Sequence, residues 1–451
     1  MNTINPIMNR LASLYKPIFI FIRMRSKLSL LITLVLMVSL LYGQNYQEIS
    51  GRNALNVIST SVPFLMIAPD ARAGSMGDVG VSTTPDVYSM HWNPAKYAVF
   101  FNDSVYQVKI VKDGIEQHET RVKLSDDMKV GLAYSPWLRN LVPDMNLAYL
   151  AVQKRLNQNS AVAATLRFFT LGDIQFTDIH GGDQGTFRPN EWALDATYAR
   201  KLSDHLSMAV AGRFIYSNLT QGQNVQGIPS SAGTSVAADV ALYWEKEVYW
   251  FNDLDTRFAW GANISNIGSK LGYSEASIKK DFIPTNLRIG PTLHLGLDEY
   301  NEISISVDIN KLLVPTPPHY KRDSTNSPIQ IPGTDKFEIE KGMDNDVSVV
   351  TGMIQSFYDA PGGFAEEMRE LYYSVGVEYW YNKVFAIRGG AFYEDKTKGN
   401  RKFFTLGAGL RYNVFGLDFS YLIPVDSRNN PLQNTVRFAL TFDLGATTRG
   451  R

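Results

Sequence analysis

The sequence predicts an all-β protein, a transmembrane antiparallel β-barrel of about 14 strands with an N-terminal plug. Three observations predict this fold. From about residue 128 onward, segments of roughly ten residues alternate apolar and polar side chains, as strands with one apolar face do. The connections between these segments alternate between short turns and long loops, which is typical of outer-membrane barrels. Past the N-terminal region, no apolar run reaches the roughly 20 residues that a transmembrane helix needs.

The N-terminal region carries an export signal. Basic residues around Arg25 precede an almost unbroken apolar stretch over residues 28–41, which ends near the small residue Gly43. This order is typical of a secretory signal peptide cleaved after Gly43. The alternative is a single membrane anchor, for which the apolar stretch is short. Residues 1–43 are therefore assigned to a signal peptide with an upstream extension, because Met24 is a second possible start.

Residues 44–103 show no clean alternation and are assigned to a plug inside the barrel. They contain a run of small residues over 71–80 and then a turn motif. In that motif Asn-Pro favours a turn, and the Trp beside it can anchor the plug against the wall. A periplasmic tail or cap is the alternative, although the apolar content argues against a solvated tail. The motif, whose role is predicted to be structural, consists of His91, Trp92, Asn93, Pro94 and Ala95.

Residues 104–451 are assigned to the barrel and its loops. The last segment shows the alternation most clearly, because Val436, Phe438, Leu440 and Phe442 alternate with polar or small residues. A soluble sandwich would also alternate, but these segments are as long as tilted strands that cross a bilayer. An even number of strands places both ends of the barrel in the periplasm. The predicted strands lie near residues 128–136, 144–155, 161–170, 190–201, 206–217, 234–247, 256–266, 285–296, 301–310, 371–381, 384–393, 402–412, 414–422 and 433–443.

Six long loops are predicted on the opposite, extracellular side, and the loop at 311–370 is much the longest. It contains a predicted helix near 346–358, in which Val350, Ile354 and Phe357 fall on one face, and a second short helix follows near 365–370. So long a loop in a compact barrel is usually a lid or a docking surface, although a mobile decoration is the alternative. The long loops are residues 171–189, 218–233, 267–284, 311–370, 394–401 and 423–432.

Several function classes find no support in the composition. The chain carries 44 basic and 44 acidic residues, so nothing indicates a nucleic-acid partner. It contains no cysteine, and its 6 histidines are scattered without zinc-ligand spacing. No nucleophile elbow, Walker loop or dinucleotide fingerprint is present. We therefore expect no enzyme activity, no cofactor and no metal site.

The plug region also resembles a known family. Residues 56–78, with the stretch Val-Pro-Phe-Leu-Met-Ile-Ala-Pro-Asp-Ala-Arg-Ala-Gly-Ser-Met-Gly, and the turn motif at 91–96 are similar to FadL-like outer-membrane proteins. Within that superfamily the chain resembles the PorV family of the type IX secretion system of Bacteroidetes. Residues 171–176 and 360–364 also resemble that family. The resemblance implies an outer-membrane protein that contacts membrane lipid.

The resemblance further implies a role in secretion. PorV-like proteins bind the C-terminal signal domain of cargo that leaves an SprA-type translocon, and they deliver the cargo to a surface attachment complex with a PorU-type sortase. We expect cargo contacts on loops 171–189, 218–233 and 311–370, which can offer strand pairing and apolar contacts. FadL-type uptake of a hydrophobic solute and a porin-like barrel are the alternatives. The candidate partner-binding residues are Phe176, Phe357, Pro361 and Phe364.

Overall fold

In the computed structural model, the residues described all lie in one compact unit, Leu55–Arg451. The assigned signal peptide, residues 1–43, lies outside the described residues. No helix in the described ranges is long and apolar enough to cross a membrane. The described ranges are residues 55–100, 104–112, 115–123, 128–139, 141–142, 144–177, 181–222, 224–225, 228–251, 254–274, 280–426 and 430–444.

Fourteen antiparallel strands close into a barrel, in which each strand pairs with its neighbours in sequence and β22 pairs with β3. The predicted fold class is confirmed. Every predicted strand is present, with its ends within three residues of the predicted ones. The strands are β3 (Met128–Pro136), β4 (Asn146–Asn157), β5 (Ser160–Thr170), β8 (Asn190–Lys201), β9 (Leu206–Asn218), β12 (Gly233–Glu247), β13 (Asp255–Gly268), β14 (Asn286–Gly296), β15 (Asn301–Leu312), β18 (Leu371–Tyr381), β19 (Phe385–Tyr393), β20 (Lys402–Tyr412), β21 (Phe415–Pro424) and β22 (Val436–Asp443).

The barrel turns its apolar side chains outward. On β8, Leu194 and Tyr198 are 51% and 45% exposed, whereas Asp195, Thr197 and Ala199 between and beside them are buried. In a soluble β-protein the alternation runs the other way, with the apolar face in the core. An apolar outer face and a polar inner face are what a barrel surrounded by lipid requires.

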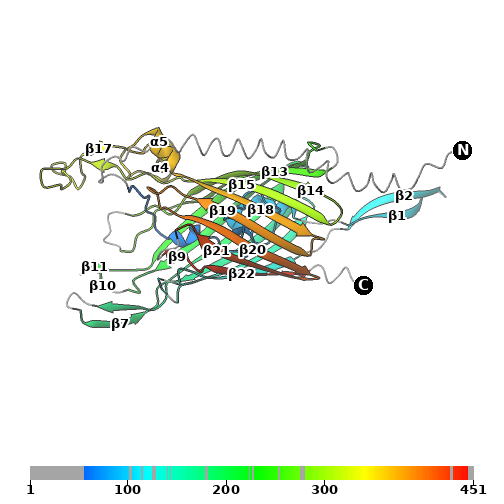
Figure 1. Cartoon of the computed structure of the whole chain (residues 1–451), viewed down its shortest axis with the longest axis horizontal. Helices are drawn as coiled ribbons and strands as arrows, with labels where there is room; N and C mark the ends of the chain where they lie inside the picture. The colour runs from blue at the N-terminus through cyan, green and yellow to red at the C-terminus, as the bar shows by residue number, and fades with distance from the viewer. Residues whose placement is uncertain are drawn as a thin grey trace. The chain divides into compact units, whose positions relative to one another are not determined.

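Shorter elements decorate the two ends of the barrel. Figure 1 shows the hairpin of β1 and β2 at one end and the elements of the long loops at the other. The barrel region was assigned from residue 104, but the closed sheet itself begins at Met128, after this separate hairpin. The shorter strands are β1 (Ser104–Lys112), β2 (Ile115–Lys123), β6 (Ile174–Thr177), β7 (Asp183–Phe187), β10 (Asn224–Val225), β11 (Ile228–Pro229), β16 (His319–Tyr320) and β17 (Ile339–Lys341). The helices are η1 (Pro63–Met66), α2 (Ala71–Gly74), α3 (Ser89–Trp92), η2 (Pro94–Val99), α4 (Val349–Gln355) and α5 (Phe364–Arg369).

The first four helices form a plug, of which α2 and η2 pack on different parts of the inner wall. Helix α2 contacts β20, β21 and β22, whereas η2 contacts β5, β8, β9 and β12. Asp70 caps α2 by accepting a hydrogen bond from the Ala73 backbone N–H at 2.8 Å. A porin keeps an unplugged passage, so a plug that reaches both sides of the lumen argues against that alternative.

Glycines on the strands let the plug backbone approach the wall closely. A Cβ added to Gly390 on β19 would lie 2.1 Å from the carbonyl carbon of Met76, and one added to Gly261 on β13 would lie 2.2 Å from the carbonyl oxygen of Val81. Real Cβ atoms cannot approach backbone so closely, so these two positions require glycine.

The plug runs through the lumen from the long-loop end to the short-turn end. Its first described residues lie among the long loops, where the Asn56 N–H donates to the carbonyl of Thr397 at 3.1 Å. Its last described residue is Phe100. The Nζ of Lys129, at the start of β3, lies 3.9 Å from the centroid of the Phe100 ring. The plug therefore touches structures at both ends of the barrel.

Candidate functional site

The predicted turn motif lies inside the barrel and is fully buried. The Trp92 indole N–H donates to Asp70 at 2.6 Å. The Asn93 side-chain amide donates to two carbonyls at 2.8 Å, that of Val81 in the plug and that of Leu242 on β12. Asn93 thus joins two plug segments to the wall, which supports a structural role for this motif.

The other motif residues extend the same contacts. A ring nitrogen of His91 lies 2.8 Å from the guanidinium of Arg167 on β5. Pro94 opens η2, and the Ala95 carbonyl accepts a hydrogen bond from the Ser207 hydroxyl at 2.9 Å. These contacts join the motif to β5 and β9, and its structural role stays a prediction.

Charged pairs across the lumen reinforce the plug. Arg72 on α2 lies 2.7 Å from Glu378 on β18, and Arg388 on β19 lies 2.6 Å from the same carboxylate. Arg388 also lies 2.8 Å from Asp418 on β21. These side chains are almost completely buried. Buried charges need such partners, so the plug and three strands are held in one register.

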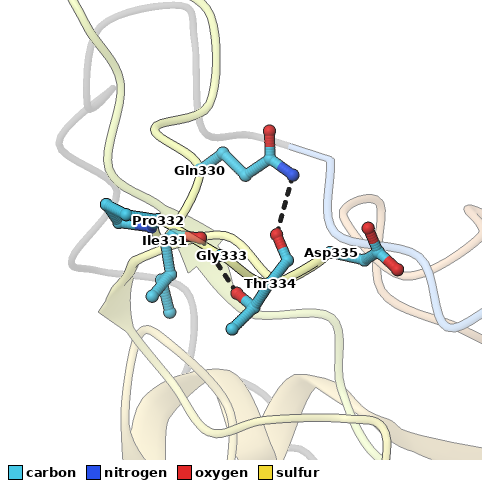
Figure 2. A pocket seen from close by; sticks show the side chains of 6 residues that line it. All are labelled: Gln330, Ile331, Pro332, Gly333, Thr334 and Asp335. Carbon is cyan, nitrogen blue, oxygen red and sulfur yellow. Dashed lines mark hydrogen bonds between the residues drawn. The ribbon is translucent and has the colours of Figure 1, made fainter.

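A hollow of about 370 Å³ lies in the long loop, in the segment that connects β16 to β17 (Figure 2). All of its lining residues, 330–335, belong to one turn. The Gln330 amide donates to the carbonyl of Thr334 at 2.8 Å, and the Thr334 hydroxyl donates to the carbonyl of Ile331 at 3.0 Å. The polar groups are thus engaged within the turn itself, and no second segment converges on it.

In the long loop, α4, α5 and the turn after α4 carry exposed apolar side chains, which we call the loop patch. Ser348 caps α4 by accepting from the Thr351 N–H at 3.2 Å, and the apolar stripe of this helix then faces solvent. Large apolar side chains exposed outside the lipid-facing wall often mark an interaction site. The loop patch consists of Val350, Ile354, Phe357, Tyr358 and Phe364, which are 50–78% exposed.

Beneath the loop patch lies a buried group of charges, the base cluster. Its members join α5 to the end of β15 and to the loop between β19 and β20. Lys311 lies 3.0 Å from Glu367 and 2.7 Å from Glu370. Lys398 lies 2.5 Å from Glu366 and 2.9 Å from Glu370. All five side chains are buried, so α5 is held in one position on the barrel rim.

Asp359, between α4 and α5, gives the loop a pH dependence. One carboxyl oxygen accepts from the Thr316 N–H at 3.1 Å, while burial, and then the charges of Glu367 and Glu370, raise the pKa of Asp359 to about 6. A raised pKa means that the folded loop binds the proton more tightly than the unfolded loop, so stability is lost as the pH rises through about 6. The pKa of Glu366 is shifted downward, so its protonation changes the stability of the loop only at a pH lower than that at which Asp359 titrates.

We therefore expect the loop to resist protease better at about pH 5 than at about pH 7.5, by on the order of 1 kcal/mol. Asp359→Asn removes the ionisable group and should remove most of this difference. The measurement is the cleavage rate within residues 311–370 of the barrel in detergent, at both pH values. An equal pH difference in wild type and variant would contradict the assignment.

The structure brings together some of the predicted partner-binding residues. Phe357 and Phe364 both belong to the loop patch, and Pro361 lies half-buried between them. Phe176 lies on β6, in a different hairpin at the same end of the barrel, and its side chain is outside the described part (Figure 1). Sequence reasoning missed the base cluster. One feature of the sequence could have indicated it, namely the two adjacent acidic residues Glu366 and Glu367 in a short helix with apolar neighbours.

No group of side chains that could hold a metal ion occurs among the residues that the structure describes. The family model described as "Type IX secretion system protein PorV" matches residues 50–112 and 120–319, more than half of the chain. No curated protein sequence matches the chain.

Solved barrels resemble the structure only distantly. The Pseudomonas putida toluene transporter TodX is 9% identical, with 87% of this chain and 100% of that chain covered and a TM-score of 0.43. A Pseudomonas aeruginosa FadL homologue is 10% identical, with coverages of 86% and 100% and a TM-score of 0.39. BamA from Haemophilus ducreyi lacking POTRA domains 1–3 is 9% identical, with coverages of 77% and 76% and a TM-score of 0.31. No property of this chain follows from these weak similarities.

Proposed function

Because this chain belongs to the PorV family of type IX secretion proteins of the outer membrane, we propose that it captures the C-terminal signal domain of secreted cargo at the cell surface. The cargo arrives from an SprA-type translocon and is passed to an attachment complex that contains a PorU-type sortase. In this role the barrel binds and transfers a protein, and the sortase performs the chemistry.

The observation that carries this proposal is the loop patch on its buried base cluster. Binding energy in protein interfaces concentrates in a few aromatic and large apolar side chains. Such side chains bind best when they are already held in the bound arrangement, because less conformational entropy is lost. Phe357 and Phe364 are 50% and 78% exposed, while Glu370 beneath them is 2% exposed and paired with two lysines.

We expect the double variant Phe357→Ser, Phe364→Ser to weaken binding of a purified type IX signal domain at least tenfold, because it removes two anchors. The measurement is a titration with the barrel in detergent or nanodiscs. Tyr249→Ser is the matched control, because Tyr249 is 86% exposed at the short-turn end and its loss should not change binding. Equal affinity in wild type and the double variant would place the cargo site elsewhere.

A pull-down of the tagged protein from its native outer membrane in mild detergent tests the wider proposal. Recovery of a very large translocon barrel, a sortase or proteins that share one C-terminal domain supports it. A barrel that purifies alone with a stoichiometric fatty acid or other lipid would refute it in favour of hydrophobic uptake.

A further inference from the structure

The described part of the plug starts at the long-loop end with residues 55–60, which we call the strap; their alternating exposure indicates an extended chain. Its side chains alternate between the protein and solvent. Ile58 packs on the apolar cluster under the long loops, whereas Leu55 and Val57 point outward and are 77% and 48% exposed. Two large apolar side chains in water on an extended chain resemble one face of an unpaired strand.

The strap is held by its inner edge. The Asn56 N–H donates to the Thr397 carbonyl at 3.1 Å, and its side-chain amide donates to the Pro317 carbonyl at 3.2 Å and to Glu366 of the base cluster at 3.1 Å. Successive N–H groups of an extended chain point to opposite edges. The Val57 N–H therefore points away from Thr397, toward the outer edge of the strap.

The strap is also continuous with the loop patch. Glu366, which accepts from Asn56, belongs to α5, and Phe364 opens that helix. The same carboxyl oxygen of Glu366 accepts from Lys398, so the strap and α5 share one buried anchor. An extended edge and an apolar helical surface thus lie on one rigid base.

We propose that the strap is a second part of the cargo site, at which a β-strand of the signal domain pairs with the outer edge of residues 55–60. This inference rests on the proposed function and deepens it. Strand addition draws affinity from main-chain hydrogen bonds and specificity from alternate side chains. Here Val57 supplies the main-chain groups, and Leu55 and Val57 supply the apolar contacts, while the loop patch supplies the aromatic anchors.

Val57→Pro tests the pairing. Proline removes the outward N–H and is compatible with an extended chain, so the strap itself should remain in place. We expect about fivefold weaker binding of a purified signal domain, which corresponds to one net backbone hydrogen bond. Val57→Ile keeps the N–H and the branched side chain and should bind as wild type.

Cysteine labelling gives an independent readout. The chain has no cysteine, so Leu55→Cys is a single target for a membrane-impermeant maleimide on intact cells. We expect rapid labelling, which added signal domain should slow. Tyr249→Cys at the opposite end should stay unlabelled.

Each outcome decides between the two proposals. In one outcome, the loop-patch variant loses binding, but Val57→Pro binds as wild type and added signal domain does not slow the labelling of Leu55→Cys. That outcome overturns the proposed role of the strap and leaves the cargo function intact. A Leu55→Cys that resists labelling without added domain means that other residues cover the strap, which also overturns the inference. A signal domain that does not bind the wild-type barrel overturns both.

Discussion

Gly390→Val is expected to expel the plug from its seat against β19 and to destabilise the barrel by about 3 kcal/mol or more. The new Cβ would lie 2.1 Å from the carbonyl carbon of Met76 and 2.3 Å from the nitrogen of Gly77. Both obstacles are backbone, so no side-chain rotation can relieve the overlap. The Gly77 N–H also donates to the Thr405 hydroxyl at 2.8 Å, and this hydrogen bond would be lost as the plug retreats.

The adjacent residue offers a matched control. A Cβ on Gly389 would find its nearest atoms, on Leu406 and Thr405, at 3.8 Å, which is ordinary contact distance. Gly389→Val therefore makes the same chemical change without meeting the plug, and it should cost little. The free energy of unfolding in urea, followed by the mobility shift of the folded barrel on gels, measures both. Equal losses in the two variants would mean that strand propensity, and not the plug, sets the cost.

The barrel could be predicted well because its signal is local. Alternation along a strand follows from backbone geometry alone, so segments such as Leu371–Tyr381 were found with their correct ends. The hairpin of β1 and β2 was not predicted, and the barrel region was drawn from residue 104. β2 contains seven polar or charged residues among its nine, so the hairpin does not show two successive segments with an apolar stripe.

The candidate site was predicted only in part, because its support depends on contacts between distant segments. Phe357 and Phe364 were recognisable as apolar residues in a long loop. The charges beneath them come from β15, α5 and the loop before β20, and nothing in the local sequence indicates that Lys398 meets Glu366. Likewise, the strap contacts the long loop through Asn56, at a separation of 310 residues from Glu366. Such pairings appear only when the barrel closes.

We expect a second large effect from Lys398→Met in the base cluster. This substitution should release α5 and the loop patch without unfolding the barrel. Lys398 is 4% exposed and is paired with Glu366 and Glu370. Removal of one partner from a buried ion pair typically costs about 3–5 kcal/mol, because the other charge stays buried. Surface loops have little local stability to spare, so this cost should open the loop. Hydrogen exchange over α5 measures the opening, while strands β18 and β19 should stay protected.

Lys336→Met is the control in the same loop. Lys336 lies 2.7 Å from Asp344, but these side chains are 58% and 43% exposed, and ion pairs so open to water contribute little to stability. A pH series adds a second test. Burial raises the pKa of Glu366, but the hydrogen bond and charge of Lys398 bring it below its ordinary value. Without Lys398 that pKa should rise, so the defect should shrink as the pH is lowered and the carboxyl takes up a proton. A defect of equal size at all pH values would mean that the Lys398 side chain acts through packing alone, and the base cluster would then not be what holds the loop patch.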